Sequence, residues 1–187
     1  MKLFISGFLV AVLVLMSIGA ALIYGGAYNV AADDGHSAIE TQILSAAMTY
    51  SVKAHAGSIT PPSGFDNEHQ IGHGFRLYDE MCVECHGAPG KKPGEIGVGL
   101  TPQPPTLSKT VGRWNMAELF WILKHGIKAT GMPAFGKTHS DEQLWSLVAF
   151  IKKLPGLTPE QYKSLNETTG PMHDHGKDRG DDHEHQH

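Results

Sequence analysis

The chain is poor in cysteine, because Cys82 and Cys85 are the only two among its 187 residues. Two thiols so close together cannot provide a disulfide framework for the fold. A basic excess is also absent, since 15 Lys and Arg residues face 19 Asp and Glu residues. Basic and aromatic residues do not interleave either, so we expect no nucleic-acid partner. No internal repeat is present, and the length suits one modest domain with tails.

The longest uncharged run, Leu3 to Tyr24, lies near the N-terminus. As a helix it would span roughly 33 Å, about the hydrocarbon thickness of a bilayer. A cleaved signal is the alternative, because small residues follow within 25–32. Lys2 precedes the run, and Asp33 follows it. This favours a single-pass protein of the cell inner membrane, anchored through residues 3–24, with the bulk of the chain in the periplasm or an equivalent extracytoplasmic space.

Composition shifts divide the chain into four parts. We expect an anchor or signal (1–32), a juxtamembrane helix with a Pro-rich linker (33–66), a folded domain (67–165) and a disordered tail (166–187). The juxtamembrane helix, about 38–55, begins at a capping-box pattern and carries an apolar stripe of Ile39, Ile43, Ala47 and Tyr50. This stripe could lie on the membrane surface or pack against the domain, and packing is favoured.

Apolar residues at helical spacing predict an all-α domain of about three core helices. The first runs from about residue 67 into Cys82, the second covers about 116–125, and the third starts near Ser140 and ends at Leu154–Pro155. Residues 158–162 could add one further helical turn, because a proline is well tolerated at its start.

Cys82-Val83-Glu84-Cys85-His86 is a C-x-x-C-H sequence, the attachment signature of a covalent haem. The two thiols would bond the haem vinyl groups, and His86 would take one axial position on iron. A thioredoxin-type dithiol is disfavoured, because a helix precedes the motif and a loop follows it. A zinc site is disfavoured as well, because no second cysteine pair is available. We therefore expect one haem c.

We look for the second axial ligand in the segment Gly131–Gly136, whose glycines and proline are incompatible with a regular helix or strand. Met132 lies there between Gly131 and Pro133, whereas the other methionines of the domain sit at helical core spacing. A thioether opposite His86 would raise the reduction potential compared with bis-histidine ligation. Such a site would be six-coordinate and suited to passing one electron.

Three motifs together resemble the signatures of class I, mono-haem cytochrome c of the membrane-anchored bacterial type. They are Cys82–His86, the Pro-x-Leu step Pro105–Leu107, and Gly131–Gly136. The resemblance spans about 67–155 and implies the cytochrome c fold, with its core helices around one covalent haem. The juxtamembrane helix and the tail lie outside it.

By this resemblance, the carbonyl of Pro105 should accept a hydrogen bond from His86 Nδ1, which orients the imidazole. Leu107 should pack on the haem face. The resemblance also implies that Gly74 and Tyr78 lie at a helix crossing and pack on an aromatic of the last core helix, with Phe150 as the candidate.

Other candidates rest on weaker patterns. Arg113 and Trp114 could contact haem propionates, although a surface arginine and a core tryptophan are the alternative. The tail combines carboxylates with histidines that could bind a transition metal, namely His173, His175, His183, His185 and His187.

The leading functional hypothesis is a non-enzymatic electron carrier between donor and acceptor proteins, with no small-molecule substrate. The alternatives are an electron-transfer subunit of a dehydrogenase or terminal oxidase, a haem-based sensor, and a metal-binding protein.

Overall fold

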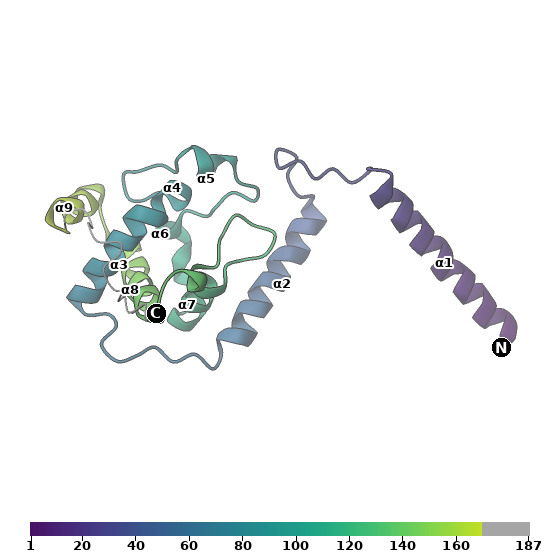
Figure 1. The fold of residues 1–187 in the computed structure, drawn as a ribbon, viewed down its shortest axis with the longest axis horizontal. Coiled ribbons are helices and arrows are strands. Elements are labelled where there is room, and N and C mark those ends of the chain that lie inside the picture. Colours follow the sequence, from purple (N-terminus) through teal and green to yellow (C-terminus); the bar gives the residue numbers. More distant parts are fainter. Residues whose placement is uncertain (170–187) are drawn as a thin grey trace, which may run out of the picture. The chain divides into compact units, whose positions relative to one another are not determined.

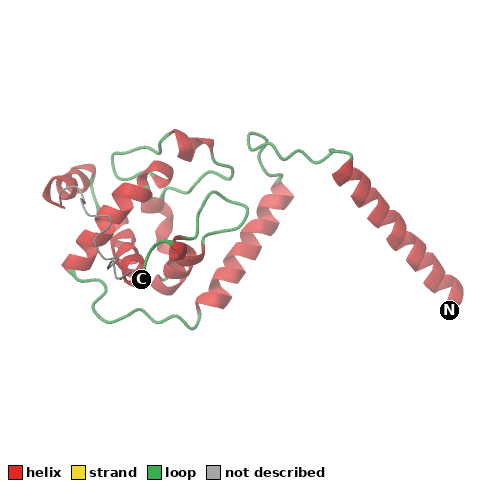
Figure 2. Cartoon of the chain, in the orientation of Figure 1, coloured by secondary structure: helices red, strands yellow, loops and turns green. Residues whose placement is uncertain are grey.

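The computed structural model describes residues 1–169, and within them helices are joined by loops with no β-strand (Figure 2). This confirms the predicted all-α class. In chain order the elements are α1 (Lys2–Tyr24), α2 (Ala38–Ala56), α3 (Glu68–Met81), α4 (Val83–His86), α5 (Glu95–Gly99), α6 (Leu107–Thr110), η1 (Val111–Arg113), α7 (Met116–His125), η2 (Phe135–Lys137), α8 (Asp141–Lys153), η3 (Leu154–Gly156) and α9 (Pro159–Thr169). They form two compact units, Met1–Gly35 and a second unit that begins at His36.

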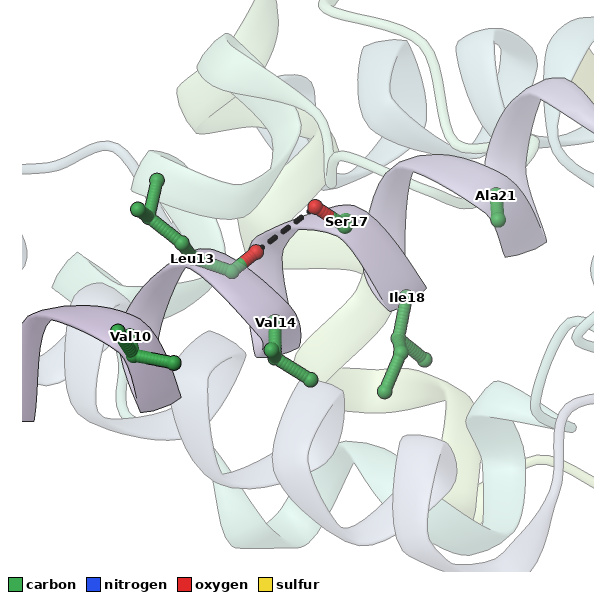
Figure 3. Close-up of a pocket in the computed structure, with 6 residues that line it drawn as sticks. All are labelled: Val10, Leu13, Val14, Ser17, Ile18 and Ala21. Atoms are coloured by element: carbon green, nitrogen blue, oxygen red, sulfur yellow. Dashed lines mark hydrogen bonds between the residues drawn. The ribbon is translucent and has the colours of Figure 1, made fainter. Parts of the chain in front are cut away.

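The first unit contains the single helix α1, none of whose residues is buried. Its mean hydropathy reaches 2.5, and it is long and apolar enough to cross a membrane, a test that a signal sequence would also pass. Figure 3 shows one face of α1, lined by the apolar side chains of Val10, Leu13, Val14 and Ile18 together with Ser17. The Ser17 hydroxyl donates a hydrogen bond to the Leu13 carbonyl at 2.8 Å. The one polar group of this face is therefore satisfied within the helix, as a bilayer environment requires.

The second unit is built on the crossing of α3 and α8 (Figure 1). Gly74 lies at the crossing, where an added Cβ would overlap the Ser146 carbonyl oxygen and lie 3.0 Å from Phe150 Cβ. One turn later, the rings of Tyr78 and Phe150 are 5.3 Å apart. The expected packing of Gly74 and Tyr78 on Phe150 is confirmed, and it anchors the helix that ends at the cysteine motif.

Helix α7 completes the core beside α8. It begins at a capping box in which Asn115 Oδ1 accepts from the Glu118 amide and the Glu118 carboxylate accepts from the Asn115 amide, at 2.9 and 2.8 Å. Inside the unit, the ring of Phe120 stacks on Trp145 with centroids 4.3 Å apart and planes 11° from parallel. This aromatic layer joins the two helices on either side of the Met132 loop.

Helix α2 packs against α7 and therefore belongs to the same compact unit, which starts before the expected boundary at residue 67. The ring of His55 lies 5.6 Å from that of Trp121 in α7, and Val52 and Ala56 of α2 are only 1 % and 3 % exposed. The stripe that was expected to pack is on the other side of the helix, because Ile39 and Ile43 are exposed. Helix α2 packs on the domain, as expected. The prediction that it does so through its apolar stripe is wrong.

Helix α9 extends the fold beyond the single turn expected at 158–162, since it runs to Thr169. Its Tyr162 is buried and meets Phe75 of α3 edge-on, with ring centroids 5.2 Å apart. Burial of this aromatic side chain stabilises α9 against α3. The helix includes residues 166–169, the first four of the tail segment 166–187. The rest of the expected tail lies outside the described residues.

Candidate functional site

The cysteine motif forms a single helical turn at the end of α3. Cys82 closes α3, and its carbonyl accepts hydrogen bonds from the amides of Cys85 and His86 at 3.2 and 2.8 Å. Residues three apart in such a turn lie on one side of it, so the two thiols share a face. A shared face fits the attachment of one flat group through both sulfurs.

The backbone around this turn is held from two sides. The Tyr78 hydroxyl donates to the Gly87 carbonyl at 2.7 Å, which fixes the residue directly after the motif. The Gly94 amide donates to the Glu84 carbonyl at 2.8 Å, so the following loop is tied back onto the motif itself. The geometry of the cysteines is therefore set by the fold and does not depend on a free loop.

His86 lies at the end of α4, with its imidazole oriented by one backbone contact. Its Nδ1 is 2.8 Å from the Pro105 carbonyl oxygen, the contact that the class I resemblance implies. Burial lowers the pKa of His86, and the hydrogen bond to Pro105 opposes that shift. A carbonyl can only accept, so Nδ1 carries the proton and the Nε2 lone pair is left available to a metal.

Met132 lies in the loop between α7 and η2, whose backbone is closed by hydrogen bonds. The Met132 amide donates to Thr130 Oγ1 at 3.1 Å, and its carbonyl accepts from the Ile127 amide at 3.3 Å. Its side chain is partly buried and packs against the core. A Cβ on neighbouring Gly131 would come 2.6 Å from Leu100 Cδ2, so this loop touches the segment that leads to Pro105.

The thiol chemistry of Cys82 argues against a redox dithiol. Cys82 is buried, and burial raises its pKa to about 12, with a further contribution from Cys85. Thioredoxin-type chemistry requires a thiolate near neutral pH and therefore a lowered pKa. The residues present fit a covalent haem, because two thiols share one face of a turn next to an imidazole with an available nitrogen.

The remaining candidates have distinct surroundings. Leu107 begins α6 and is partly buried against the core. Trp114 is in the core, and its carbonyl lies 3.4 Å from Lys152 Nζ. Arg113 is exposed and places its guanidinium 4.8 Å from the Trp114 ring. Contacts of this pair with haem propionates stay a prediction. The five tail histidines, His173, His175, His183, His185 and His187, lie outside the described residues.

One cluster beside the motif was missed from the sequence. Asp79, three residues before Cys82, accepts hydrogen bonds from Lys91 Nζ at 2.7 Å and from the Tyr162 hydroxyl at 2.8 Å. It joins α3, the loop after the motif and α9. The apolar pair Tyr162 and Leu165, three residues apart, was the one signal that α9 has a buried face.

One of three comparisons with known proteins bears on this site, a match to a protein-family model. Residues 69–151 match the family model described as cytochrome C oxidase, cbb3-type, subunit III. A search of curated proteins found no match. Among solved structures, a chain of the Kuenenia stuttgartiensis reducing HAO-like protein complex is similar over 51 % of this chain, with 23 % identity and a TM-score of 0.45. The chain spans 47 % of that neighbour's length.

The helical fold, the cysteine motif and the family match together identify residues 69–151 as a cytochrome c domain. The match covers α3 to α8 and leaves out α2 and α9. The chain thus combines an N-terminal apolar helix with a domain similar to c-type cytochromes, a class of proteins that transfer electrons.

Proposed function

We propose that the protein is a single-haem electron carrier, held at the outer face of the cytoplasmic membrane by α1. One haem c would be bonded to Cys82 and Cys85 and ligated by His86 and Met132. The observation that carries this proposal is the 2.8 Å contact between His86 Nδ1 and the Pro105 carbonyl. That contact fixes the tautomer that iron ligation needs.

When bound, the haem supplies reversible one-electron chemistry, and the chain's own residues set its surroundings. The Pro105 carbonyl holds the proton on His86 Nδ1 and makes the ring a stronger ligand. The hydrogen bonds of Thr130 and Ile127 to the Met132 backbone hold this loop in one shape. Two ligands fixed by the fold would leave no open position for a substrate, so we propose that the protein is a carrier and not an enzyme.

Met132→Ala tests the ligand assignment. We expect loss of the thioether–iron absorption band and a lower reduction potential, because a thioether ligand stabilises reduced iron. Met116→Ala is the matched control, since Met116 is 39 % exposed at the start of α7 and should leave both properties unchanged. A variant at 132 that keeps the band and the potential would show that another residue ligates the iron.

The location is tested separately from the ligands. A haem stain and redox spectrum of the membrane fraction, followed by alkaline extraction, should show the protein retained through α1. Mass determination of the purified chain distinguishes an anchor from a cleaved signal, because cleavage removes the residues before the small-residue positions within 25–32. A haem protein released into the soluble fraction would contradict the anchoring.

A second candidate function is an electron-transfer subunit of a terminal oxidase, which the description of the matching family favours. Purification in mild detergent should then recover a catalytic partner in constant ratio, whereas a free carrier is purified alone. Carbon monoxide titration of the reduced protein tests the sensor alternative, which needs Met132 to leave the iron. An unchanged spectrum at neutral pH would rule that alternative out.

A further inference from the structure

Helix α2 is apolar on two opposite sides. Its inner side, with Val52 and Ala56, is buried within the compact unit. The residues on its other side are Ile39, Ile43, Ala47 and Tyr50, here called the outer stripe. At 100° per residue the outer stripe occupies about 80° of the helix circumference, and the packing contact with α7 does not use it.

The outer stripe is exposed along its length. Ile39, Ile43 and Tyr50 are 70 %, 63 % and 74 % exposed. Scattered apolar residues at a surface need no explanation, but a contiguous stripe marks an interaction site. No charged residue lies within it, and the carboxylate of neighbouring Glu40 already accepts a hydrogen bond from the Ser37 amide at 2.8 Å.

Chain connectivity indicates what covers the outer stripe. The apolar helix α1 ends at Tyr24 and α2 begins at Ala38. At about 3.5 Å per residue, the segment 25–37 reaches at most about 45 Å, so α2 cannot leave the neighbourhood of an anchored α1. Tethering turns docking into an intramolecular event, which needs little intrinsic affinity.

We propose that the outer stripe docks on the lipid surface that α1 enters, which rests on the proposed anchoring of α1. Isoleucine side chains would lie at the headgroup–acyl boundary, and Tyr50 suits this interface because its ring is apolar and its hydroxyl is polar. Since the inner side of α2 is packed against α7, docking would also orient the cytochrome c domain. The haem would then face its partners in a restricted set of orientations.

Spin labels on the full-length haem protein in lipid nanodiscs test the proposal. One label is placed by Ile43→Cys on the outer stripe and a matched control by Thr41→Cys, which is exposed roughly 160° around the same helix. A third, by Leu13→Cys in α1, reports anchoring. The native cysteines are consumed as thioethers in the proposed site, so the unsubstituted protein should take no label.

We measure how often each label collides with lipid-soluble oxygen and with a water-soluble nickel chelate. The oxygen-to-nickel ratio at position 43 should be several-fold higher than at position 41 and approach that at position 13. Equal ratios at 43 and 41, with a high ratio at 13, would overturn the docking and leave the anchor intact. A low ratio at 13 would overturn both.

Two further results would show that the outer stripe contacts protein and not lipid, and would overturn the proposal. Spin–spin broadening at position 43 that disappears on dilution with unlabelled protein would show a second copy on the outer stripe. A label at 43 that neither oxygen nor nickel reaches would show another protein there. Each labelled variant must keep the haem spectrum of the unsubstituted protein. If the unsubstituted protein takes up spin label, a native cysteine is free, which would contradict the proposed haem attachment.

Discussion

Replacing Gly74 with alanine should separate the two helices on which the domain is built. A Cβ at this position would lie 2.5 Å from the Ser146 carbonyl carbon and 3.0 Å from Phe150 Cβ. An ordinary contact needs about 3.5 Å or more, so α3 and α8 would have to move apart by roughly 1 Å. Both obstacles are α8 backbone or the start of a buried side chain, and neither can turn away.

The magnitude follows from two opposing effects. Alanine gains about 1 kcal/mol over glycine in a helix interior. Overpacking a tight core costs about 1–3 kcal/mol and sometimes more, and here the whole helix pair must shift. We expect a net loss of about 1–2 kcal/mol in the free energy of unfolding, with weakened Soret absorption as the motif at the end of α3 moves.

Gly72→Ala is the matched control for this experiment. Gly72 lies in the same helix, two residues earlier, and a Cβ there meets no atom within 4 Å. It should stabilise the protein by up to about 1 kcal/mol, since only the helix propensity changes. Urea denaturation of both variants in detergent, followed by circular dichroism and Soret absorption, measures the difference. If the variant at 74 is as stable as the variant at 72, the close helix crossing is wrong.

Three further predictions concern stability. Tyr162→Phe removes a hydrogen bond to the Asp79 carboxylate and should cost about 1–2 kcal/mol in urea denaturation; an unchanged midpoint would contradict it. Burial lowers the pKa of His73, so the unfolded chain binds its proton first as pH falls through 6.5. As the pH is lowered from 6.5, the melting temperature should therefore fall, and it should fall less steeply for His73→Gln than for the unsubstituted protein. Equal slopes of melting temperature against pH would show that His73 is not responsible. Asn115→Ala removes the cap of α7 and should cost about 1 kcal/mol, a loss that Asn115→Asp should largely avoid.

Features set by local sequence were predicted well. The capping-box pattern predicted for the juxtamembrane helix forms a complete box at Ser37, and α7 and α8 begin with such boxes at Asn115 and Ser140, because the partners lie three residues apart and need no other part of the fold. The close approach at Gly74 was expected as well, because the resemblance to class I cytochrome c implies a helix crossing at this position.

Contacts between distant residues were predicted only where the resemblance to class I cytochrome c implied them. Helix α2 has apolar residues on two sides, and periodicity alone cannot tell which side meets α7. Tyr162 finds Asp79 and Phe75 across more than eighty residues of chain, so nothing near α9 in the sequence indicates their contact. Assignment of Met132 as a ligand rests on its loop setting and stays a prediction.

The pairing of α3 with α8 also sets the order in which the domain can form. Gly74 and Ser146 meet only after the chain between them has been made, and loop closure over such a distance is slow. Helix α3, which ends at Cys82, therefore lacks its packing partner α8 while that stretch is being synthesised. We expect the motif to stay open to the machinery that attaches a cofactor during this interval, and to close when α8 and Tyr162 arrive. The part of the chain that is made last thus completes the packing around the helix that leads to the motif.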